Sequence, residues 1–242
     1  MAKQAQTKGC CSLCGAEYTR AGMSKHIIAC APEHFAQKFP SKASKKSVFL
    51  LVVHGAFNPE YWMYVAVPAT ATLEDLDGFL RDIWLECCGH LSQFIINKVY
   101  YVDERALTDS WIASSHEDRS MRTQLKEVLK KGKEFIHEYD MGTTTRLKLK
   151  VLSTFDAQMP QNQVVLLARN HPPEIRCEVC GEPAAFVCTE CIWDGLGWLC
   201  ARCAKQHECG EEMLLPVVNS PRVGMCAYTG DADWEQNEKE EP

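Results

Sequence analysis

The chain has 242 residues, of which 46% are hydrophobic and 24% charged, and its formal net charge at pH 7 is −6. This is the composition of a globular protein and excludes a disordered or fibrous chain. The longest strongly apolar run, residues 48–53, is too short to cross a bilayer, and the polar, basic N-terminus has no apolar segment behind it. We therefore expect a soluble, cytoplasmic protein with no membrane partner.

Fourteen cysteines are the most unusual feature of the composition. In a chain without a signal peptide, cysteines spaced as C-x2-C indicate intracellular metal sites rather than a disulfide framework. One such pair lies near the N-terminus and three lie near the C-terminus. The spacing predicts metal sites in a reducing compartment.

Charge is distributed unevenly along the chain. Residues 1–50 carry eight Lys or Arg against two acidic residues, and residues 119–150 carry nine against four. The last twelve residues, 231–242, hold six carboxylates and one lysine, and we expect them to be disordered. A basic front end permits contact with phosphate, and an acidic tail can solubilise the chain or mask that front end.

The first predicted element is a small metal-binding module over residues 1–32. It contains the spacing C-x2-C-x11-H-x3-C, and its candidate ligands are Cys11, Cys14, His26 and Cys30. A C-x2-C knuckle supplies two thiolates, and one helical turn brings the histidine and the last cysteine to the same side, as a tetrahedral zinc site requires. Cys10 is an alternative ligand with a poorer spacing to the second cysteine.

This module resembles a CCHC-type zinc finger shortened by one residue between its second and third ligands. Tyr18 and Met23 stand where such a finger places the two apolar side chains that cover its helix. A piece this small has almost no core of its own, so we expect it to unfold without metal and to end at Pro32. A basic, Ser-rich linker is predicted over residues 33–47.

Residues 48–170 are predicted to form an α+β domain. Strand-like runs occur at residues 48–53, 61–67, 94–102, 133–140, 146–155 and 164–168. Within 146–151, apolar and basic residues alternate, which is typical of a strand with one wet face. We expect an antiparallel sheet with two helices against one face, flanked by two small zinc modules.

Two helices are predicted between these strands. Thr72 and Asp75 have the spacing of a capping box, and the apolar residues that follow recur at helical spacing until Gly89. A second, basic amphipathic helix is predicted over residues 120–131, ended by Gly132.

The third predicted domain, residues 171–230, is rich in cysteine and has the spacing C-x2-C-x7-C-x2-C-x8-C-x2-C-x3-H-x-C. Its eight candidate ligands are Cys177, Cys180, Cys188, Cys191, Cys200, Cys203, His207 and Cys209. Eight ligands suit two zinc ions, so three ions are expected for the whole chain. Zinc sites closed by four protein ligands hold folds together rather than catalyse. Redox chemistry is the alternative, but no thioredoxin-like context surrounds any of the pairs.

This region resembles the cross-braced double-zinc modules, namely the MYND, HIT and B-box fingers. The resemblance implies that the first and third cysteine pairs share one ion and that the second pair shares the other with His207 and Cys209. The single residue between His207 and Cys209 is tighter than those families use, so Cys226 remains an alternative last ligand. Trp193, Leu196, Trp198 and Leu199 form either the core of the module, which we prefer, or a face that binds a partner.

The middle of the chain is similar to the plasmid pRiA4b ORF-3-like family. The similarity lies in ATLEDLDGFLRDIWLECCGHLSQFIINKVYY and KEFIHEYDMGTTTRLKLKVL, covers about 48–170 and extends to LPVVNSPRVGMCAYTG at 215–230. The resemblance implies a compact α+β domain and no particular activity. The residues that match the family pattern are His90, Phe94, Tyr139, Asp140 and Gly142, whereas Thr143 stands where many members have an Asp.

Two classes of function follow from these features. The first is a non-catalytic zinc protein that binds nucleic acid, RNA in preference to DNA, or a ribonucleoprotein such as the ribosome. Its candidate contacts are Arg20 and Lys25 on the finger and Lys42, Lys45 and Lys46 in the linker. The second is a protein-binding adaptor that uses the C-terminal module. An enzyme that uses His90 and Asp140 is a third hypothesis, but no third group, nucleophile or metal set accompanies this pair, so we prefer a structural contact.

Overall fold

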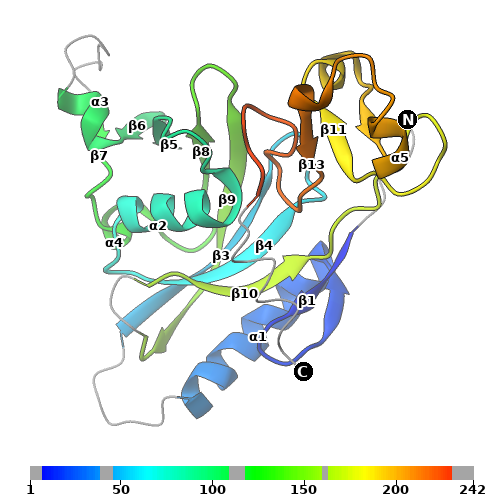
Figure 1. Ribbon diagram of the computed structural model, residues 1–242. Helices are drawn as coiled ribbons and strands as arrows, with labels where there is room; N and C mark the ends of the chain where they lie inside the picture. Colours follow the sequence, from blue (N-terminus) through cyan, green and yellow to red (C-terminus); the bar gives the residue numbers. More distant parts are fainter. Residues whose placement is uncertain (1–6, 39–45, 109–117, 160–162, 231–242) are drawn as a thin grey trace. The chain divides into compact units, whose positions relative to one another are not determined.

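The computed structural model describes residues 7–38, 46–108, 118–159 and 163–230 (Figure 1). These residues fall into two compact units, the first within Met1–Phe79 and Leu91–His171 and the second within Leu80–His90 and Pro172–Pro242. Within the described ranges, no helix is both long and apolar enough to cross a membrane. Lys42, Lys45 and the acidic tail lie outside the described residues.

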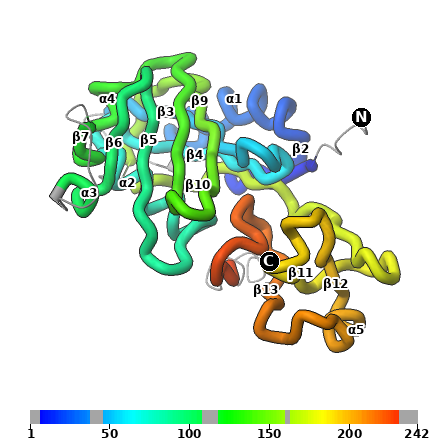
Figure 2. Tube along the Cα trace, turned by 90° about the horizontal axis from the view of Figure 1, so that it is seen from above, coloured from blue at the N-terminus to red at the C-terminus, as the bar shows by residue number. Residues whose placement is uncertain are grey.

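The first unit is built on one sheet. Its described strands are, in spatial order, β2 (Glu17–Thr19), β1 (Lys8–Cys11), β10 (Val165–Asn170), β4 (Trp62–Pro68), β3 (Lys46–Gly55), β9 (Thr145–Ala157), β8 (Glu134–Tyr139), β5 (Ser92–Ile96), β6 (Val99–Val102) and β7 (Arg119–Ser120). All neighbours are antiparallel except β6 and β7. Figure 2 shows β5 and β6 running side by side at one end of this sheet. The predicted α+β class with an antiparallel sheet is confirmed.

The predicted strands at 48–53, 61–67 and 146–155 appear as β3, β4 and β9. In β9 the side chains of Leu147 and Leu149 are buried, whereas those of Lys148 and Lys150 are exposed, as the alternation predicts. The run at 94–102 is not one strand. It is the hairpin β5–β6, because the chain turns back at Asn97 and Lys98, whose φ angles are 55° and 67°.

The helix α2 (Leu73–Leu80) begins with the predicted capping box. The backbone N–H of Thr72 donates to Asp75 Oδ2 at 2.7 Å, and the backbone N–H of Asp75 donates to Thr72 Oγ1 at 3.1 Å. The helix was expected to continue to Gly89. It instead passes into a π-helical turn, η1 (Arg81–Leu85), and the following residues leave the helical conformation before Gly89, whose φ is +69°.

The second helix was predicted over residues 120–131, and this length is wrong. Only α4 (Leu125–Val128) is helical there, after β7, and a short α3 (Glu104–Thr108) precedes it. The backbone N–H groups of Leu125 and Lys126 donate to the carbonyl oxygens of Ala71 and Ala69. Because these amides bond to a neighbouring segment, the helical pattern in the sequence is overridden by tertiary pairing.

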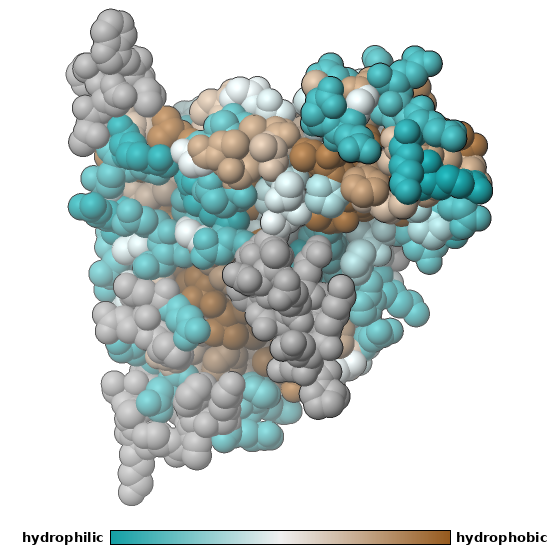
Figure 3. Space-filling view, in the orientation of Figure 1, coloured by the Kyte–Doolittle hydropathy of each residue, from teal (hydrophilic) through white to brown (hydrophobic). Residues whose placement is uncertain are grey.

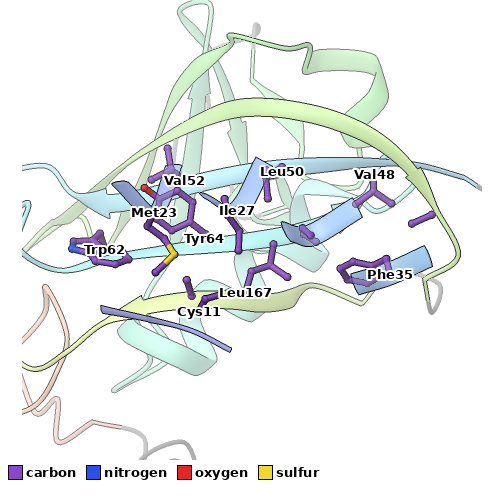
Figure 4. Close-up of a cluster of buried hydrophobic side chains, with 14 residues drawn as sticks. Cys11, Met23, Ile27, Phe35, Val48, Leu50, Val52, Trp62, Tyr64 and Leu167 are labelled. Carbon is purple, nitrogen blue, oxygen red and sulfur yellow. The ribbon is translucent and has the colours of Figure 1, made fainter. Parts of the chain in front are cut away.

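The N-terminal module is part of the first unit and not a separate finger domain. Strand β1 pairs with β10, so the finger hairpin extends the large sheet. Helix α1 (Arg20–Lys38) buries Met23, Ile27 and Phe35 against strand side chains that include Tyr64 and Leu167, as Figure 4 shows.

The predicted end of the module at Pro32 is also wrong. Pro32 lies inside α1, which continues to Lys38, so the first part of the predicted linker 33–47 is helical. Its last two residues, Lys46 and Ser47, already belong to β3. A helix held to a sheet by several buried side chains tolerates the lost hydrogen bond at an internal proline.

In its described residues, the second unit contains a small sheet and four short elements. Its sheet has the order β12 (Trp198–Leu199), β11 (Phe186–Cys188) and β13 (Leu214–Pro216). The remaining elements are η2 (Cys191–Asp194), α5 (Ala201–Ala204), η3 (Glu211–Met213) and the π-helical turn η1. The segment around η1 is joined to the C-terminal part by Trp84, whose Nε1 donates to the carbonyl oxygen of Asn219 at 3.1 Å.

Candidate metal centres and a basic hollow

Four groups of Cys and His side chains meet the geometry of a metal site among the described residues. In each group, one potential ligand atom per residue lies within 4.8 Å of all the others. Three groups contain the predicted ligands, and they are Cys11, Cys14, His26 and Cys30; Cys177, Cys180, Cys200 and Cys203; Cys188, Cys191, His207 and Cys209. The fourth group was not predicted and consists of Cys87, Cys88, His90 and Cys226.

The N-terminal cluster joins the β1 knuckle to helix α1. Gly15, with φ 73°, turns the knuckle, and its N–H donates to the carbonyl oxygen of Cys11 at 2.8 Å. The Cys11 and Cys30 sulfurs are 4.0 Å apart, and Cys14 Sγ lies 3.3 Å from His26 Nε2. Tetrahedral zinc with bonds of about 2.3 Å to sulfur places ligand sulfurs about 3.8 Å apart, so these separations fit a zinc ion.

The two residues expected to cover the finger helix behave differently. Met23 is completely buried, as predicted, but Tyr18 is 39% exposed. The Tyr18 ring stacks on the imidazole of His26, with centroids 4.9 Å apart. Tyr18 therefore orients a candidate ligand instead of filling a core, because the core of this module is supplied by the sheet.

The C-terminal clusters have the cross-braced pairing that the resemblance implied. Cys180 Sγ lies 3.6 Å from the sulfurs of both Cys200 and Cys203. In the other cluster, Cys191 Sγ lies 3.5 Å from His207 Nε2 and 3.7 Å from Cys209 Sγ. The alternative last ligand, Cys226, belongs to a different group.

Backbone N–H groups favour the thiolate form of one cysteine in each C-terminal cluster, Cys177 and Cys188. A hydrogen bond from the backbone N–H of Cys200 is the main cause that lowers the pKa of Cys177. Burial opposes it, but further backbone N–H groups add to the lowering, and the pKa is about 6. Burial raises the pKa of Cys188, but N–H groups of Cys191 and Glu190 outweigh it and bring the value to about 7. Since the thiolate is the zinc-binding form, both residues are largely ready to bind metal near neutral pH.

The apolar residues of the C-terminal module are split between core and surface. Leu199 is buried, but Trp193 is 64% exposed and Leu196 is 56% exposed. The expectation that Trp193 and Leu196 form the module's core is therefore wrong. Both lie beside the left-handed Gly195, on the turn between the second and third cysteine pairs.

His90 and Asp140, the residues of the enzyme hypothesis, belong to different units. His90 Nε2 lies 3.5 Å from Cys226 Sγ in the second unit. Asp140, in the first unit, accepts hydrogen bonds through Oδ1 from the backbone N–H groups of Gly142 and Thr143, at 2.9 and 3.2 Å. Asp140 has a left-handed backbone, with φ 67°, so its role is to shape the turn after β8.

A basic hollow of about 610 Å³ lies on one face of the large sheet. Helix α1 covers this face over β3, β4, β10 and the last part of β9, where Phe155 and Ala157 pack against it, whereas the first part of β9 and the neighbouring β8 carry exposed residues. His54 and Ile136 both lie directly opposite Lys148 in the pairing, so they share the uncovered face with it. The hollow lies between helix α1 and the strands that the helix leaves uncovered. The polar residues that line it are Arg20, Ser24, His54, Glu134, Lys148 and Lys150.

Positive charge predominates in the hollow. Lys150 Nζ forms an exposed ion pair with Glu134 Oε1 at 2.7 Å, while Arg20 Nη1 donates to the Pro59 carbonyl oxygen at 3.3 Å. Burial lowers the pKa of His54, and the charges of Arg20 and Lys148 lower it further. His54 is therefore mainly neutral near pH 7, and an anion in the hollow would favour its protonation.

An exposed aromatic residue lies beside this face and was not identified from the sequence. Phe57 is 77% exposed, and the guanidinium carbon of Arg146 lies 6.0 Å from its ring centroid. Arg146 also pairs with Glu138 at 2.5 Å. The only sequence signal for Phe57 was its position as a large aromatic in the turn-forming stretch GAFNP, where no helix or strand periodicity assigns it a role.

The predicted nucleic-acid contacts are not gathered in one place. Arg20 lines the hollow, and Lys25 is exposed on the same helix. Lys46 is exposed at the start of β3, eight residues before His54, which corresponds to about 26 Å along a strand. Lys148 and Lys150 are therefore better placed than Lys46 to act together with Arg20.

A comparison with protein families confirms the resemblance found in the middle of the sequence. A family model described as plasmid pRiA4b ORF-3-like protein matches residues 49–186. A crystal structure of a protein of unknown function, MM3350 from Methanosarcina mazei Go1, is similar at 16% sequence identity and a TM-score of 0.42, covering 58% of this chain and 76% of that chain. No curated protein matches the chain.

Proposed function

Because this chain belongs to the plasmid pRiA4b ORF-3-like family and its Cys/His clusters fit zinc, we propose that it is a non-catalytic zinc protein that binds single-stranded RNA in the basic hollow. One observation carries the proposal. Cations from helix α1 and strand β9, Arg20 and Lys148 with Lys150, converge on one concave surface of the sheet.

Zinc is the metal that suits the donor set. Thiolate and imidazole ligands favour zinc over magnesium or calcium, which prefer oxygen. In each predicted cluster all four positions of a tetrahedron are occupied by protein ligands, which leaves none for water or substrate. The metal's role in this proposal is to hold the fold, and the binding surface is provided by the sheet.

Single-stranded RNA suits the hollow because the lining combines apolar and basic side chains. Val52, Ile95 and Ile136 contribute apolar surface to the lining, against which unstacked bases can pack. The cations lie among them and can contact phosphates, while exposed Phe57 offers a ring on which a base can stack. Duplex nucleic acid keeps its bases stacked inside and would gain only the phosphate contacts.

The test is a salt-dependent titration against a mixed-sequence single-stranded RNA oligonucleotide. The double variant Arg20→Gln/Lys148→Gln should bind more weakly. The slope of log K against log salt concentration should be shallower by about 1.4, since each lost phosphate contact removes about 0.7 from the slope. Lys126→Gln is the matched control, because Lys126 is exposed on α4 in the same unit but does not line the hollow. Weak binding that is insensitive to salt and identical in all three proteins would refute the RNA proposal.

Exposed apolar residues in the second unit favour one other candidate, a protein-binding adaptor. Trp193, Leu196 and Val179 are all more than half exposed, and Figure 3 shows apolar surface within the largely hydrophilic surface of this unit. Tryptophan is enriched among residues that dominate binding energy. Recovery of the same nuclease-resistant partner by the natural chain but not by Trp193→Ala would favour the adaptor.

A further inference from the structure

We propose that Cys87, Cys88, His90 and Cys226 bind a fourth zinc ion, which ties the segment around η1 to the end of the second unit. The Cys88 and Cys226 sulfurs are 3.7 Å apart, and Cys226 Sγ lies 3.5 Å from His90 Nε2. The predicted clusters show the same separations, for example 3.7 Å between Cys191 and Cys209. These values match the edge of a zinc tetrahedron, about 3.8 Å between sulfurs.

A disulfide does not account for this arrangement. A disulfide brings two sulfurs to about 2.05 Å and involves no third group. Here three thiols and one imidazole nitrogen all lie within 4.8 Å of one another. Such convergence of four soft ligands is the arrangement that a metal ion requires and that ordinary packing of cysteines does not produce.

Charge around the cluster supports a metal. Arg222 is completely buried, and its Nη2 donates to Cys87 Sγ at 3.4 Å. Zinc with three thiolates and one neutral imidazole has a net charge of −1, and a guanidinium beside it is electrostatically favourable. Arg222 is thus an outer partner that orients and stabilises a ligand.

The ligand-bearing loop is held in place by its backbone. Gly89, with a left-handed backbone, donates its N–H to Glu86 Oε1 at 2.6 Å, which forms the turn between Cys88 and His90. The carbonyl oxygen of His90 accepts from Arg81 Nη2 at 2.6 Å. This loop therefore presents its ligands in a defined direction without a contribution from the metal.

The opposite side of the cluster is also held in place. Cys226 has a φ of 53°, and the preceding N–H of Met225 donates to the carbonyl oxygen of Arg222. Ser220 Oγ donates to the carbonyl oxygen of Trp84 at 2.7 Å, which joins the two segments of the second unit. The metal would close a loop in which His90 and Cys226 are 136 positions apart, so it would constrain the unfolded chain strongly.

The experiment measures zinc content and thiol protection on the natural chain. Native mass spectrometry should find four zinc ions per chain, and Cys88 and Cys226, although exposed, should resist alkylation until a chelator is added. Cys226→Ser should hold three ions. Cys10→Ser is the matched control and should hold four, because Cys10 belongs to none of the four groups.

Two results on the natural chain would overturn the proposal without any variant having to fold. One is three zinc ions per chain, and the other is alkylation of Cys88 and Cys226 at the same rate with and without chelator. A Cys226→Ser chain that still holds four ions would also refute it. None of these measurements depends on RNA binding, so the fourth site and the proposed function can fail separately.

Discussion

His137 Nε2 lies 2.6 Å from Asp77 Oδ1 inside the first unit, where the imidazole is completely buried. The pair joins β8 to α2 and thus fastens the helix to the face of the sheet opposite the basic hollow. The second ring nitrogen, His137 Nδ1, has no hydrogen-bond partner. This buried pair is a His and Asp contact with a structural role.

Asp77→Ala should lower the free energy of unfolding by about 1–3 kcal/mol, because it removes the carboxylate hydrogen-bonded to a buried imidazole. Urea denaturation measures the change. Glu134→Gln removes the exposed partner of Lys150 and should change the free energy of unfolding much less than Asp77→Ala does, because solvent screens the pair. Equal losses in the two variants would contradict the view that burial makes the difference.

Cys14→Ser should release one zinc ion without unfolding α1. In an isolated finger this substitution would unfold the helix, but here Met23, Ile27 and Phe35 keep α1 packed on the sheet. Hydrogen exchange should show protected α1 amides in the variant. Met23→Ala, which leaves a cavity, should destabilise the same helix by about 2–5 kcal/mol. Free exchange throughout α1 in Cys14→Ser would show that the metal alone holds the helix.

Cys177→Ser should unfold the C-terminal part of the second unit and leave the first unit folded. The sheet of the second unit has strands of only two or three residues, which cannot supply a sufficient core without metal. Limited proteolysis should cut the variant after His171 and spare the large sheet. Unfolding of the whole chain would mean that the two units are not independent.

Stability should depend on pH through His54. Burial lowers its pKa in the folded chain below the unfolded value of 6.5, so the folded state favours the neutral ring. The stabilising contribution is therefore present above pH 6.5 and is lost as the pH falls below that value. His54→Gln should show a smaller loss of unfolding free energy between pH 7.5 and 5.5 in urea titrations. Identical pH profiles would exclude His54 as the source.

RNA binding, if it uses the basic hollow, should strengthen when residues 231–242 are removed. The six carboxylates of this segment compete with phosphate for basic side chains. Titration of the chain ending at Gly230 should give a higher affinity at low salt, with the difference disappearing at high salt. A chain of unchanged affinity at low salt would show that the tail does not mask the hollow.

The features that the sequence alone determined are local ones. The ligand spacings of three clusters, the capping box at Thr72 and the alternation around Lys148 each depend on residues close together in the chain. Spacing of this kind predicts which side chains share a knuckle, a helical turn or a strand face, because backbone geometry repeats within a few residues. These predictions agree with the structure for that reason.

Only the tertiary structure decided how distant segments combine. Cys226 could not be assigned to Cys87, Cys88 and His90, because the chain between them has no periodicity that brings its ends together. The helix pattern at 120–131 was overruled by amides that bond to Ala69 and Ala71, and the finger became part of the sheet through pairing of β1 with β10. Each of these outcomes depends on contacts between residues far apart in the chain, which local propensity does not encode.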